Sequence, residues 1–437
     1  MAASGSLQEL NNSTIPRFNA STLMLLRARI VVPVSRPPID DGAVAVSAGR
    51  VAWAGRWKDR PAMAGVEVQD FGESALLPGL VNAHCHLDYT GMAGLLPPPK
   101  HFTDWIKAIV ALKASWTIED FAVSWRRGAR MLLETGTTTV ADVEAVPELL
   151  PAAWGATPLR VITFRELISL RSREAARELV ERCVNDCLGL PGSEGRVGLS
   201  PHAPYTATRE LLEQAARAAQ RRGWRLVTHV AESEEEFMMF RYGKGAMFDW
   251  LKGQRDMSDC GQGSPVQHLE RCGYLDTNVL AVHANHLDRR DASLLAANGV
   301  SVVHCPRSHD YFRHLKFPRQ ELESAGVNVC LGTDSLASVR KESGRAPKLS
   351  LFAEMQSLAR AAPGLAAEAI LRMATVNGAR ALGRAGAIGE ISRGAAADLI
   401  ALPIGGASGD VFEAVIHHAG KVAASMIGGE WAVGPAS

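Results

Sequence analysis

The stretch LVNAHCHLDYTG, residues 80–91, places His84 and His86 one residue apart at the end of a short apolar run. Such a run is typical of a buried β-strand, and residues i and i+2 of a strand point to the same face. The two imidazoles are therefore expected to converge on one point. A single histidine at a strand end is more often a hydrogen-bonded core residue than a ligand, so the pair is interpreted together with the other strand ends.

Seven more apolar runs follow along the chain, and helix-like stretches mostly separate them. One such stretch begins at Thr117, with Asp120 as its capping-box partner, and ends at Gly136, while another spans residues 208–223. Near-continuous apolar strands that alternate with helices indicate a parallel sheet buried on both faces. We therefore predict an α/β fold, a (β/α)8 TIM-like barrel, with an open doubly wound sheet as the alternative. The eight expected strands are residues 80–86, 137–143, 159–164, 196–200, 225–230, 278–284, 300–305 and 327–334.

The two ends of the chain have a different pattern from the middle. Residues 23–77 and 396–435 consist of short β-like segments that glycine and proline interrupt. Two β-rich ends around an alternating middle indicate one small sheet domain built from both termini. The expected organisation is a composite β-sandwich of residues 1–79 and 385–437 and a barrel of residues 80–384.

The composition is that of an ordinary globular protein. Of the 437 residues, 47% are hydrophobic and 21% are charged, and the formal net charge is +1. Without a Lys/Arg-rich block, nothing favours nucleic acid or an anionic membrane as a partner. No apolar stretch approaches the ~18–20 residues of a membrane-spanning helix, and the polar N-terminus lacks a signal-peptide core. Seven cysteines without a C-x-x-C pair are typical of a reduced, cytoplasmic protein.

Most of the expected strands end in residues that carry chemistry. The active sites of such barrels lie where the C-terminal ends of the strands meet. Taken singly, His304 is more typical of a core residue and Asp334 of a turn or helix cap. Histidines on the first, fifth and sixth strands and an aspartate on the eighth are instead expected to form one site. The strand-end residues are His84, His86, Arg165, Glu166, His202, His229, Glu232, His283, His304 and Asp334.

Neutral imidazole nitrogens and a carboxylate form a ligand set that suits Zn²⁺. A catalytic zinc ion keeps one position for water and lowers the pKa of that water to roughly 7. A nearby carboxyl group must then carry the proton to the leaving group. Glu232 is the natural candidate, because it lies three residues after His229 and so just beyond the end of the strand.

The motifs at these strand ends resemble those of the amidohydrolase superfamily. They are LLPGLVNAHCHLD on the first strand, HVAESEEE on the fifth, VHANHLD on the sixth and LGTDSLAS on the eighth. The segments SPHAPYT and CPRSHDYF resemble the metal-dependent deaminase and chlorohydrolase branch, in which a small composite β-sandwich is usual. The resemblance covers nearly the whole chain. Its motifs are highly specific for the superfamily, moderately specific for the branch and weakly specific for the substrate.

The resemblance implies a role for each matching residue. The implied metal ligands are His84, His86, His229 and Asp334. Asp334 would also share in accepting the proton of the attacking water, and His283 would hydrogen-bond that water or the developing oxygen. Glu232 would carry a proton to the ring nitrogen and then to the leaving amine. Substrate contacts are implied for His202, Trp105, Glu166 and Arg307.

One metal ion per chain is expected, because strand 4, RVGLS, lacks the lysine with which dinuclear members usually bridge two metals. Zn²⁺ is the expected ion, with Fe²⁺ or Mn²⁺ as alternatives. His309 departs from the family pattern, since an asparagine often follows Ser308, and the contacts at that end of the pocket stay open. Residues 237–277, between the fifth and sixth strands, either cover the site in part or pack as a helix with a surface loop.

The resemblance implies a hydrolase that acts on carbon–nitrogen bonds other than peptide bonds and releases ammonia from an amino-substituted aromatic ring. The favoured substrate is an adenine nucleoside such as aminodeoxyfutalosine. S-adenosylhomocysteine, methylthioadenosine, guanine and pterins are alternatives, as are triazine-type dechlorination and amide-ring opening. A non-catalytic ligand-binding barrel is a more remote interpretation. The expected partners are a small-molecule substrate and a second copy of the chain, in a cytoplasmic homodimer, with no nucleic acid or membrane.

Overall fold

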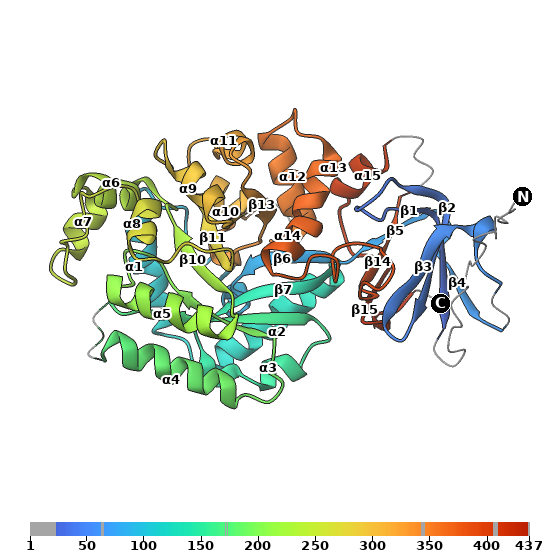
Figure 1. Ribbon diagram of the computed structural model, residues 1–437, viewed down its shortest axis with the longest axis horizontal. Helices are drawn as coiled ribbons and strands as arrows, with labels where there is room; N and C mark the ends of the chain where they lie inside the picture. Colours follow the sequence, from blue (N-terminus) through green and yellow to red (C-terminus); the bar gives the residue numbers. More distant parts are fainter. Residues whose placement is uncertain are drawn as a thin grey trace, which may run out of the picture.

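The computed structural model describes residues 23–62, 65–170, 172, 174–341, 346–404 and 410–435. Within them, a sheet of eight parallel strands runs in chain order, which confirms the predicted barrel strands. Each strand pairs with the next one along the chain, so the connecting helices pass over the outside of the sheet (Figure 1). The strands are β6 (Leu80–Cys85), β7 (Thr137–Glu144), β8 (Arg160–Leu167), β9 (Val197–Pro201), β10 (Leu226–Val230), β11 (Val279–His283), β12 (Ser301–His304) and β13 (Asn328–Leu331).

Two of the helices begin and end where the sequence predicts. The N-cap of α2, Thr117, exchanges hydrogen bonds with Asp120 in a capping box. The N-cap of α5 is Thr208, and Gly223 ends this helix with a φ of 64°. The helices are α1 (Phe102–Lys113), α2 (Ile118–Glu134), α3 (Ala152–Gly155), α4 (Ala176–Gly189), α5 (Arg209–Arg222), α6 (Glu234–Tyr242), α7 (Ala246–Leu251), α8 (Pro265–Arg271), α9 (Asp291–Ala297), α10 (Pro306–Phe312), α11 (Arg319–Ser324), α12 (Leu351–Ala361), α13 (Ala367–Met373), α14 (Val376–Ala381) and α15 (Val411–Ile416).

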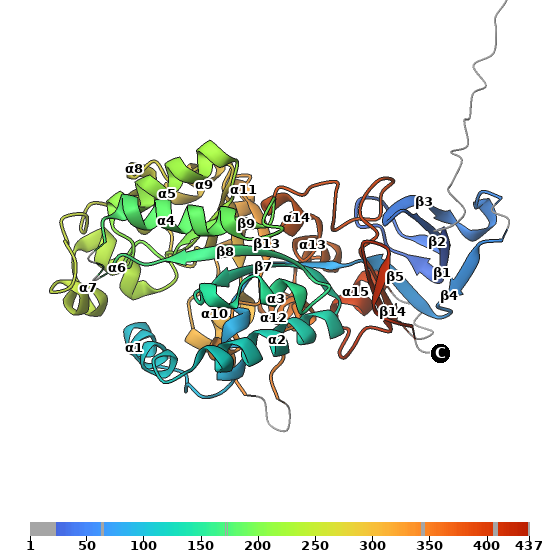
Figure 2. The same cartoon turned by 90° about the horizontal axis from the view of Figure 1, so that it is seen from below.

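A second sheet combines strands from both ends of the chain. Its order is β16-β15-β14-β5-β1-β2-β3, and β4 pairs with β1. Antiparallel pairing of β5 with β14 joins the N-terminal strands to the C-terminal ones, at one end of the molecule (Figure 2). The exact domain boundaries remain a prediction, and residues 1–22 lie outside the described residues. The strands are β1 (Met24–Val31), β2 (Ile39–Ser47), β3 (Arg50–Arg56), β4 (Glu67–Asp70), β5 (Ser74–Pro78), β14 (Leu399–Pro403), β15 (Ala424–Ile427) and β16 (Glu430–Val433).

One predicted β segment is wrong in its first part. The expected strand that begins at Phe412 lies in the helix α15, while the later part of the same stretch contains β15 and β16. The side chain of Asp410 accepts a hydrogen bond from the backbone N–H of Phe412 and so caps this helix. Val415 and Ile416 pack into the main hydrophobic core. The apolar residues of this segment therefore serve one face of a short helix.

The alternation along β6 distinguishes the barrel interior from the helix layer. Val81 and Ala83 belong to an interior cluster that contains residues from nearly every barrel strand. Leu80 and Cys85 belong to the larger cluster between strands and helices. A regular strand with this phase would place the even-numbered His84 on the outer face.

A β-bulge in β6 reverses this phase. Three steps along β6, from Asn82 to Cys85, match two steps along β7. The extra residue moves the inward-facing positions from odd to even numbers. His84 and His86 consequently face the barrel mouth, and the bulge is the local reason that the two imidazoles converge.

The first and last strands close the barrel beyond the end of β13. Cys85 and Asp334 form a parallel bridge. The carbonyl oxygen of His84 accepts hydrogen bonds from the backbone N–H groups of Thr333, at 3.0 Å, and Asp334, at 3.2 Å. The backbone N–H of His86 donates to the carbonyl oxygen of Asp334 at 3.2 Å. The same short segments therefore close the sheet and present the ionisable side chains.

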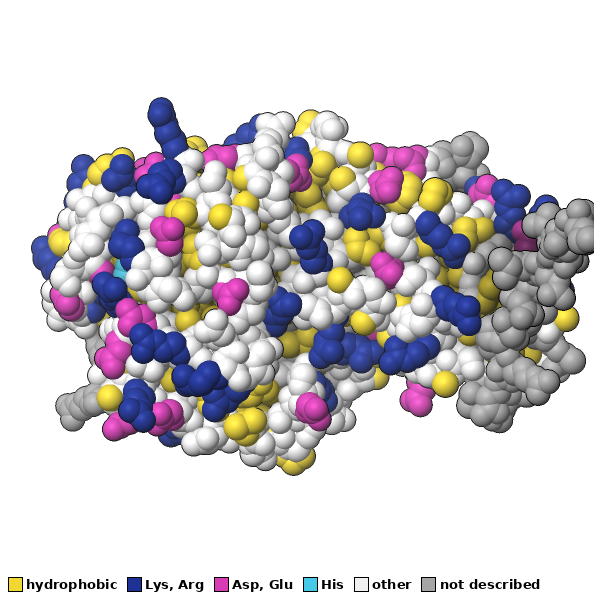
Figure 3. All heavy atoms as spheres, viewed as in Figure 1, with side chains coloured by type: hydrophobic (Ala, Val, Ile, Leu, Met, Phe, Trp, Pro, Cys, Tyr) yellow, Lys and Arg dark blue, Asp and Glu magenta, His cyan; other side chains and the backbone are white. Residues whose placement is uncertain are grey.

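Basic and acidic side chains are both spread over the surface visible in Figure 3, and several basic ones lie next to one another in its lower half. No helix among the described residues combines the length and the apolar character that crossing a membrane requires.

We predict that Gly332→Ala destabilises the closure between β6 and β13. A Cβ atom at this position would lie 2.8 Å from the carbonyl oxygen of His84 and 2.9 Å from its Cβ. Overpacking of this kind costs about 1–3 kcal/mol, so thermal unfolding should occur at a measurably lower temperature. Gly253→Ala is the matched control, because an added Cβ there meets nothing within 4 Å. Equal melting temperatures for the two variants would contradict the prediction.

Candidate metal and catalytic site

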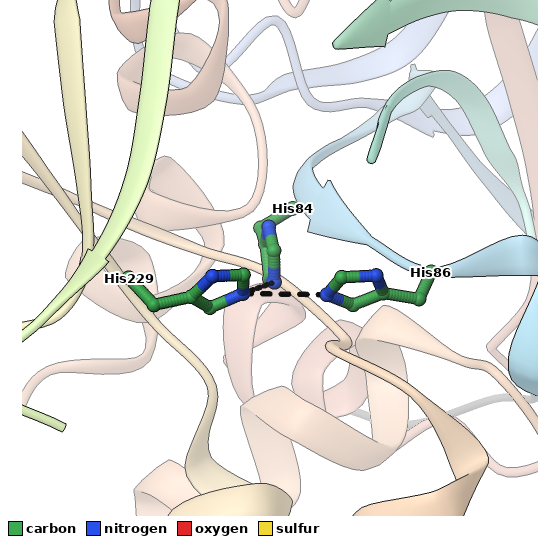
Figure 4. Close-up of side chains that lie close together, drawn as sticks. All are labelled: His84, His86 and His229. Carbon is green, nitrogen blue, oxygen red and sulfur yellow. Dashed lines mark hydrogen bonds between the residues drawn. The ribbon is translucent and has the colours of Figure 1, made fainter. Parts of the chain in front are cut away.

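Three imidazoles from two strands meet at the barrel mouth (Figure 4). The Nε2 atom of His229, on β10, lies 3.3 Å from Nε2 of His84 and 3.3 Å from Nε2 of His86. The three side chains are buried, and their potential ligand atoms all lie within 4.8 Å of one another. No other group of ligating side chains in the described parts of the chain meets this spacing.

The protonation of these imidazoles suits a metal ion. The Nδ1 of His229 donates to the carbonyl oxygen of His202 at 2.8 Å, which leaves the lone pair of Nε2 directed at the other two rings. Burial lowers the pKa of His229 to about 4, and burial together with the neighbouring imidazoles lowers the pKa of His86 well below its usual value. The lowered pKa values of His86 and His229 favour the neutral imidazole, which is the form that binds a divalent cation.

Asp334 adds a carboxylate to this group. Its Oδ1 lies 3.7 Å from Nε2 of His84 and 3.9 Å from Nε2 of His86, while its Oδ2 accepts a hydrogen bond from Ser338 at 2.8 Å. Burial alone would raise the pKa of Asp334, but the contact with His84 and the other nearby imidazoles hold this pKa well below its usual value. The carboxylate is therefore ionised and fits the fourth position of a metal site.

Glu232 and His283 form a second pair beside the imidazoles. Oε1 of Glu232 lies 3.5 Å from Nε2 of His283. His283 has a φ of 76°, in the left-handed region that non-glycine residues rarely adopt, and such strain is concentrated at functional sites. Burial raises the pKa of Glu232 well above its usual value, and the negative charges of Asp334 and Glu236 add to this effect. Glu232 therefore keeps its proton to higher pH than a solvated glutamate does.

Two residues that the sequence analysis missed fix the backbone of Glu232. Its N–H donates to Oε2 of Glu236 at 2.9 Å, and its carbonyl oxygen accepts from Nδ2 of Asn285 at 3.0 Å. Glu236 follows Glu232 by one helical turn, and Asn285 follows His283 by two residues, so both lie within the motifs already noted. The signal available in the sequence was that Glu236 and Asn285 are polar residues close to Glu232 and His283.

The predicted substrate residues divide into two groups. His202 lies beside the imidazole group, with its ring centroid 4.9 Å from that of His229, and its Nδ1 contacts the hydroxyl of Thr206 at 2.7 Å. Burial raises the pKa of Glu166, on β8, and the positive charge of Lys113 opposes this rise. Both residues lie at strand ends and therefore border the candidate site.

Trp105 and Arg307 have other neighbours. Trp105, on α1, packs edge-on against Phe312, with ring centroids 5.0 Å apart. Arg307 is held by the carbonyl oxygen of Lys348 at 2.8 Å and by the carboxylate of Glu354 at 3.6 Å. These contacts tie the Arg307 guanidinium to Glu354 on α12 and to the segment just before that helix.

The long connection between β10 and β11 packs as helices and contributes to a separate core. Met239, Phe240, Met247 and Leu251 are buried against Phe102, Ile106, Ala203 and Tyr205. Trp105 is packed against the same cluster. The connection therefore joins α1 and the segment after β9 into one wall.

Comparison with known proteins gives a consistent result. The model of the amidohydrolase family matches residues 75–432. A 5-methylthioadenosine/S-adenosylhomocysteine deaminase of Syntrophobacter fumaroxidans is 33% identical over 385 residues, which are 83% of this chain and 80% of the relative.

Two solved structures extend the comparison to the fold. An adenosine deaminase from Xanthomonas campestris with bound zinc has a TM-score of 0.78 and 26% identity, with 93% of this chain and 92% of the other covered. The aminofutalosine deaminase of Helicobacter pylori has a TM-score of 0.80 at 20% identity, with 93% and 99% covered, and its likeness concerns the fold. By sequence and by structure, the chain belongs to the amidohydrolase family and is a hydrolase of carbon–nitrogen bonds.

Proposed function

We propose that the protein is a zinc-dependent deaminase that replaces the exocyclic amino group of an adenine nucleoside with oxygen and releases ammonia. The observation that carries this proposal is the convergence of the Nε2 atoms of His84, His86 and His229, with the carboxyl groups of Asp334 and Glu232 beside them. The pKa of Asp334 is held low and the pKa of Glu232 is raised, which favours Asp334 as the proton acceptor and Glu232 as the donor. Hydrolytic deamination needs both.

The metal-binding set is His84, His86, His229 and Asp334. When bound, a divalent ion supplies Lewis-acid activation of the attacking water. The four residues fit one ion, and the expected order of preference is Zn²⁺ before Fe²⁺ or Mn²⁺. Support comes from the converging Nε2 atoms and from the zinc in the structure of the Xanthomonas campestris relative.

The chain's own groups then move the protons. Glu232 protonates the ring nitrogen next to the amino-bearing carbon, which lets water attack that carbon, and Asp334 accepts the proton of the attacking water. His283 hydrogen-bonds the oxygen as it changes from hydroxyl to carbonyl. The amine receives a proton and leaves as ammonia, so one water is consumed for each amino group released.

The proposed substrate class is an adenine nucleoside with a substituted 5′ position. The support is the similarity to methylthioadenosine and S-adenosylhomocysteine deaminases, at 33% identity in the case of Syntrophobacter fumaroxidans. Methylthioadenosine and S-adenosylhomocysteine are therefore tested first, and aminodeoxyfutalosine, which the sequence motifs favour, is tested beside them. His202 and Glu166 are the proposed nucleoside contacts.

The experiment is a screen for ammonia release from these three nucleosides, adenosine, guanine, cytosine and a pterin, with product mass as the second readout. Gain of one mass unit accompanies exchange of an amino group for a carbonyl oxygen. Release of chloride from a chlorotriazine, without ammonia from any purine, would favour the dechlorination alternative. Absence of turnover with all compounds on metal-loaded protein would contradict the proposal.

The metal prediction is one tightly held divalent ion per chain. His86→Ala should lose the ion and the activity together, because it removes one of the three converging Nε2 atoms. His417→Ala, at an exposed histidine of α15's C-cap, is the control that keeps both. Metal analysis of the three purified proteins is the measurement. Two stoichiometric ions in the unaltered protein would instead support a dinuclear site.

We predict that Glu232→Gln keeps the ion and the fold but lowers turnover at least ~10²-fold, the lower range for a general acid–base group. An amide of similar shape preserves the packing beside His283 but has no ionisable proton to transfer. Glu234→Gln, two residues away and exposed on α6, should leave turnover unchanged. Near-normal ammonia release by the Glu232 variant would show that the proton passes through His283 or Asp334.

A homodimer in the cytoplasm remains a proposal that rests on the family resemblance. Light scattering over a range of concentrations tests the oligomeric state, and a species of one chain's mass, 46.8 kDa, at every concentration would contradict it.

A further inference from the structure

Outside the metal site, a second group of histidines lies next to a cavity. His304 is the last residue of β12, and its neighbour Val303 belongs to the barrel interior, so His304 faces the helix layer. Its ring stacks on Phe317 with centroids 3.8 Å apart and planes 9° apart. His309 and His314 continue the group, with ring centroids 5.3 Å from His304 to His309 and 5.4 Å from His309 to His314.

These three histidines line a cavity of about 1020 Å³. The cavity lies between α10, the segment 313–318, the start of α11 and the C-terminal part of α12, which are the orange elements of Figure 1. Its lining contains none of the proposed metal ligands and neither Glu232 nor His283. A volume of this size accommodates a metabolite, and the cavity is separate from the proposed active site.

The lining carries an excess of positive charge. Arg313, Lys316 and Arg360 come from three different parts of it, and none of them has an ion-pair partner among the described residues. The fourth cation, Arg319, is paired with Glu323. The acidic lining residue Asp310 lies 3.7 Å from Arg340, and Glu321 is the remaining acid. Three unpaired cations around one cavity attract an anion.

Two polar atoms of the histidine group are buried beside this cavity. His304 is only 4% exposed, and its Nδ1 has no hydrogen-bond partner in the described structure. The Nε2 of His314 is likewise buried without a partner. Both atoms are covered by the surrounding protein, so Arg313, Lys316 and Arg360 are the groups that offer charge and hydrogen bonds to a guest in the cavity.

A metal ion fits this cavity less well than an anion. Among the described residues, only His84, His86 and His229 have ring nitrogens close enough together to hold a metal ion. The ring nitrogens of His304, His309 and His314 lie too far apart for this. Three unpaired Lys and Arg side chains would also repel a cation. Oxygen atoms of a phosphate or carboxylate accept from Arg, Lys and imidazole N–H groups and match the charge of the lining.

We propose that the cavity lined by His304, Arg313, Lys316 and Arg360 is a binding site for a small anionic molecule that carries a phosphate or carboxylate group. His309 connects this site to the catalytic mouth. Its Nδ1 contacts Oδ1 of Asn285 at 3.0 Å, and Nδ2 of Asn285 donates to the carbonyl oxygen of Glu232 at 3.0 Å. An anion in the cavity lies beside His309, and hydrogen bonds lead from His309 through Asn285 to the backbone of Glu232.

The test is calorimetric titration of the full-length, metal-loaded protein with inorganic phosphate and, separately, with succinate. The test variant is Arg313→Gln/Lys316→Gln/Arg360→Gln. The control is Arg127→Gln/Arg221→Gln/Arg393→Gln, which removes the same charge at exposed sites outside the cavity lining. Neither triple variant alters a buried contact of the core, and thermal unfolding checks that both remain folded.

The expected result is saturable binding of at least one of the two anions to the unaltered protein and to the control, with affinity at least tenfold weaker in the test variant. Binding should also weaken as the salt concentration rises, because exposed cations are screened. Binding of phosphate alone or succinate alone identifies which group the site prefers. Failure of both anions to bind the unaltered protein, or equal binding by the two variants, would overturn the proposal. Neither readout depends on deaminase activity.

Discussion

The close approach of β13 to β6 is the constraint on which the site depends. Gly332 allows it, since a side chain there would meet the backbone of His84. The hydrogen bonds that close the barrel run between the backbones of His84, His86, Thr333 and Asp334. Closing the sheet and assembling the proposed ligand set are consequently one event, because three of the four ligands belong to the residues that make the closure.

The electrostatics of the site follow from burial. Without water, the histidines favour the neutral form, and an isolated carboxyl group favours the protonated form. Glu232 follows this rule, and its pKa rises. Asp334 departs from it because of its contact with His84 and the other imidazoles around it, and its pKa falls. The difference in function between the two carboxyl groups thus originates in their neighbours, within a site that is equally dry for both.

Much of this arrangement could be predicted from the sequence, because apolar runs locate strands and polar residues at their ends locate the mouth of a barrel. His84, His86, His229 and Asp334 come together in the structure as that logic requires. The strict alternation of inward and outward side chains along a strand, however, fails at His84 and at His283. The bulge in β6 turns His84 inward, and the positive φ of His283 brings its ring to Glu232.

Other features depended on contacts that no local pattern reveals. Arg307 stays a predicted substrate contact, and its guanidinium lies 3.6 Å from the carboxylate of Glu354, which is distant in the sequence. The segment after Asp410 has enough apolar residues for a strand, but it forms a short helix that the side chain of Asp410 caps. His304 points outward because Val303, its neighbour in β12, points into the barrel. Which residues of β12 point inward is known only once its pairing with the adjacent strands is known.

The bulge in β6 also has a consequence for redesign. A strand tolerates changes of side chain more readily than changes of length, and here the count of residues between Asn82 and Cys85 sets the direction of every side chain that follows. Removing one residue from this interval would restore regular pairing and rotate both imidazoles toward the helices, with the composition of the motif almost intact. The HxH sequence alone is therefore an incomplete description of the metal-binding element, and a transplanted version must carry the extra residue with it.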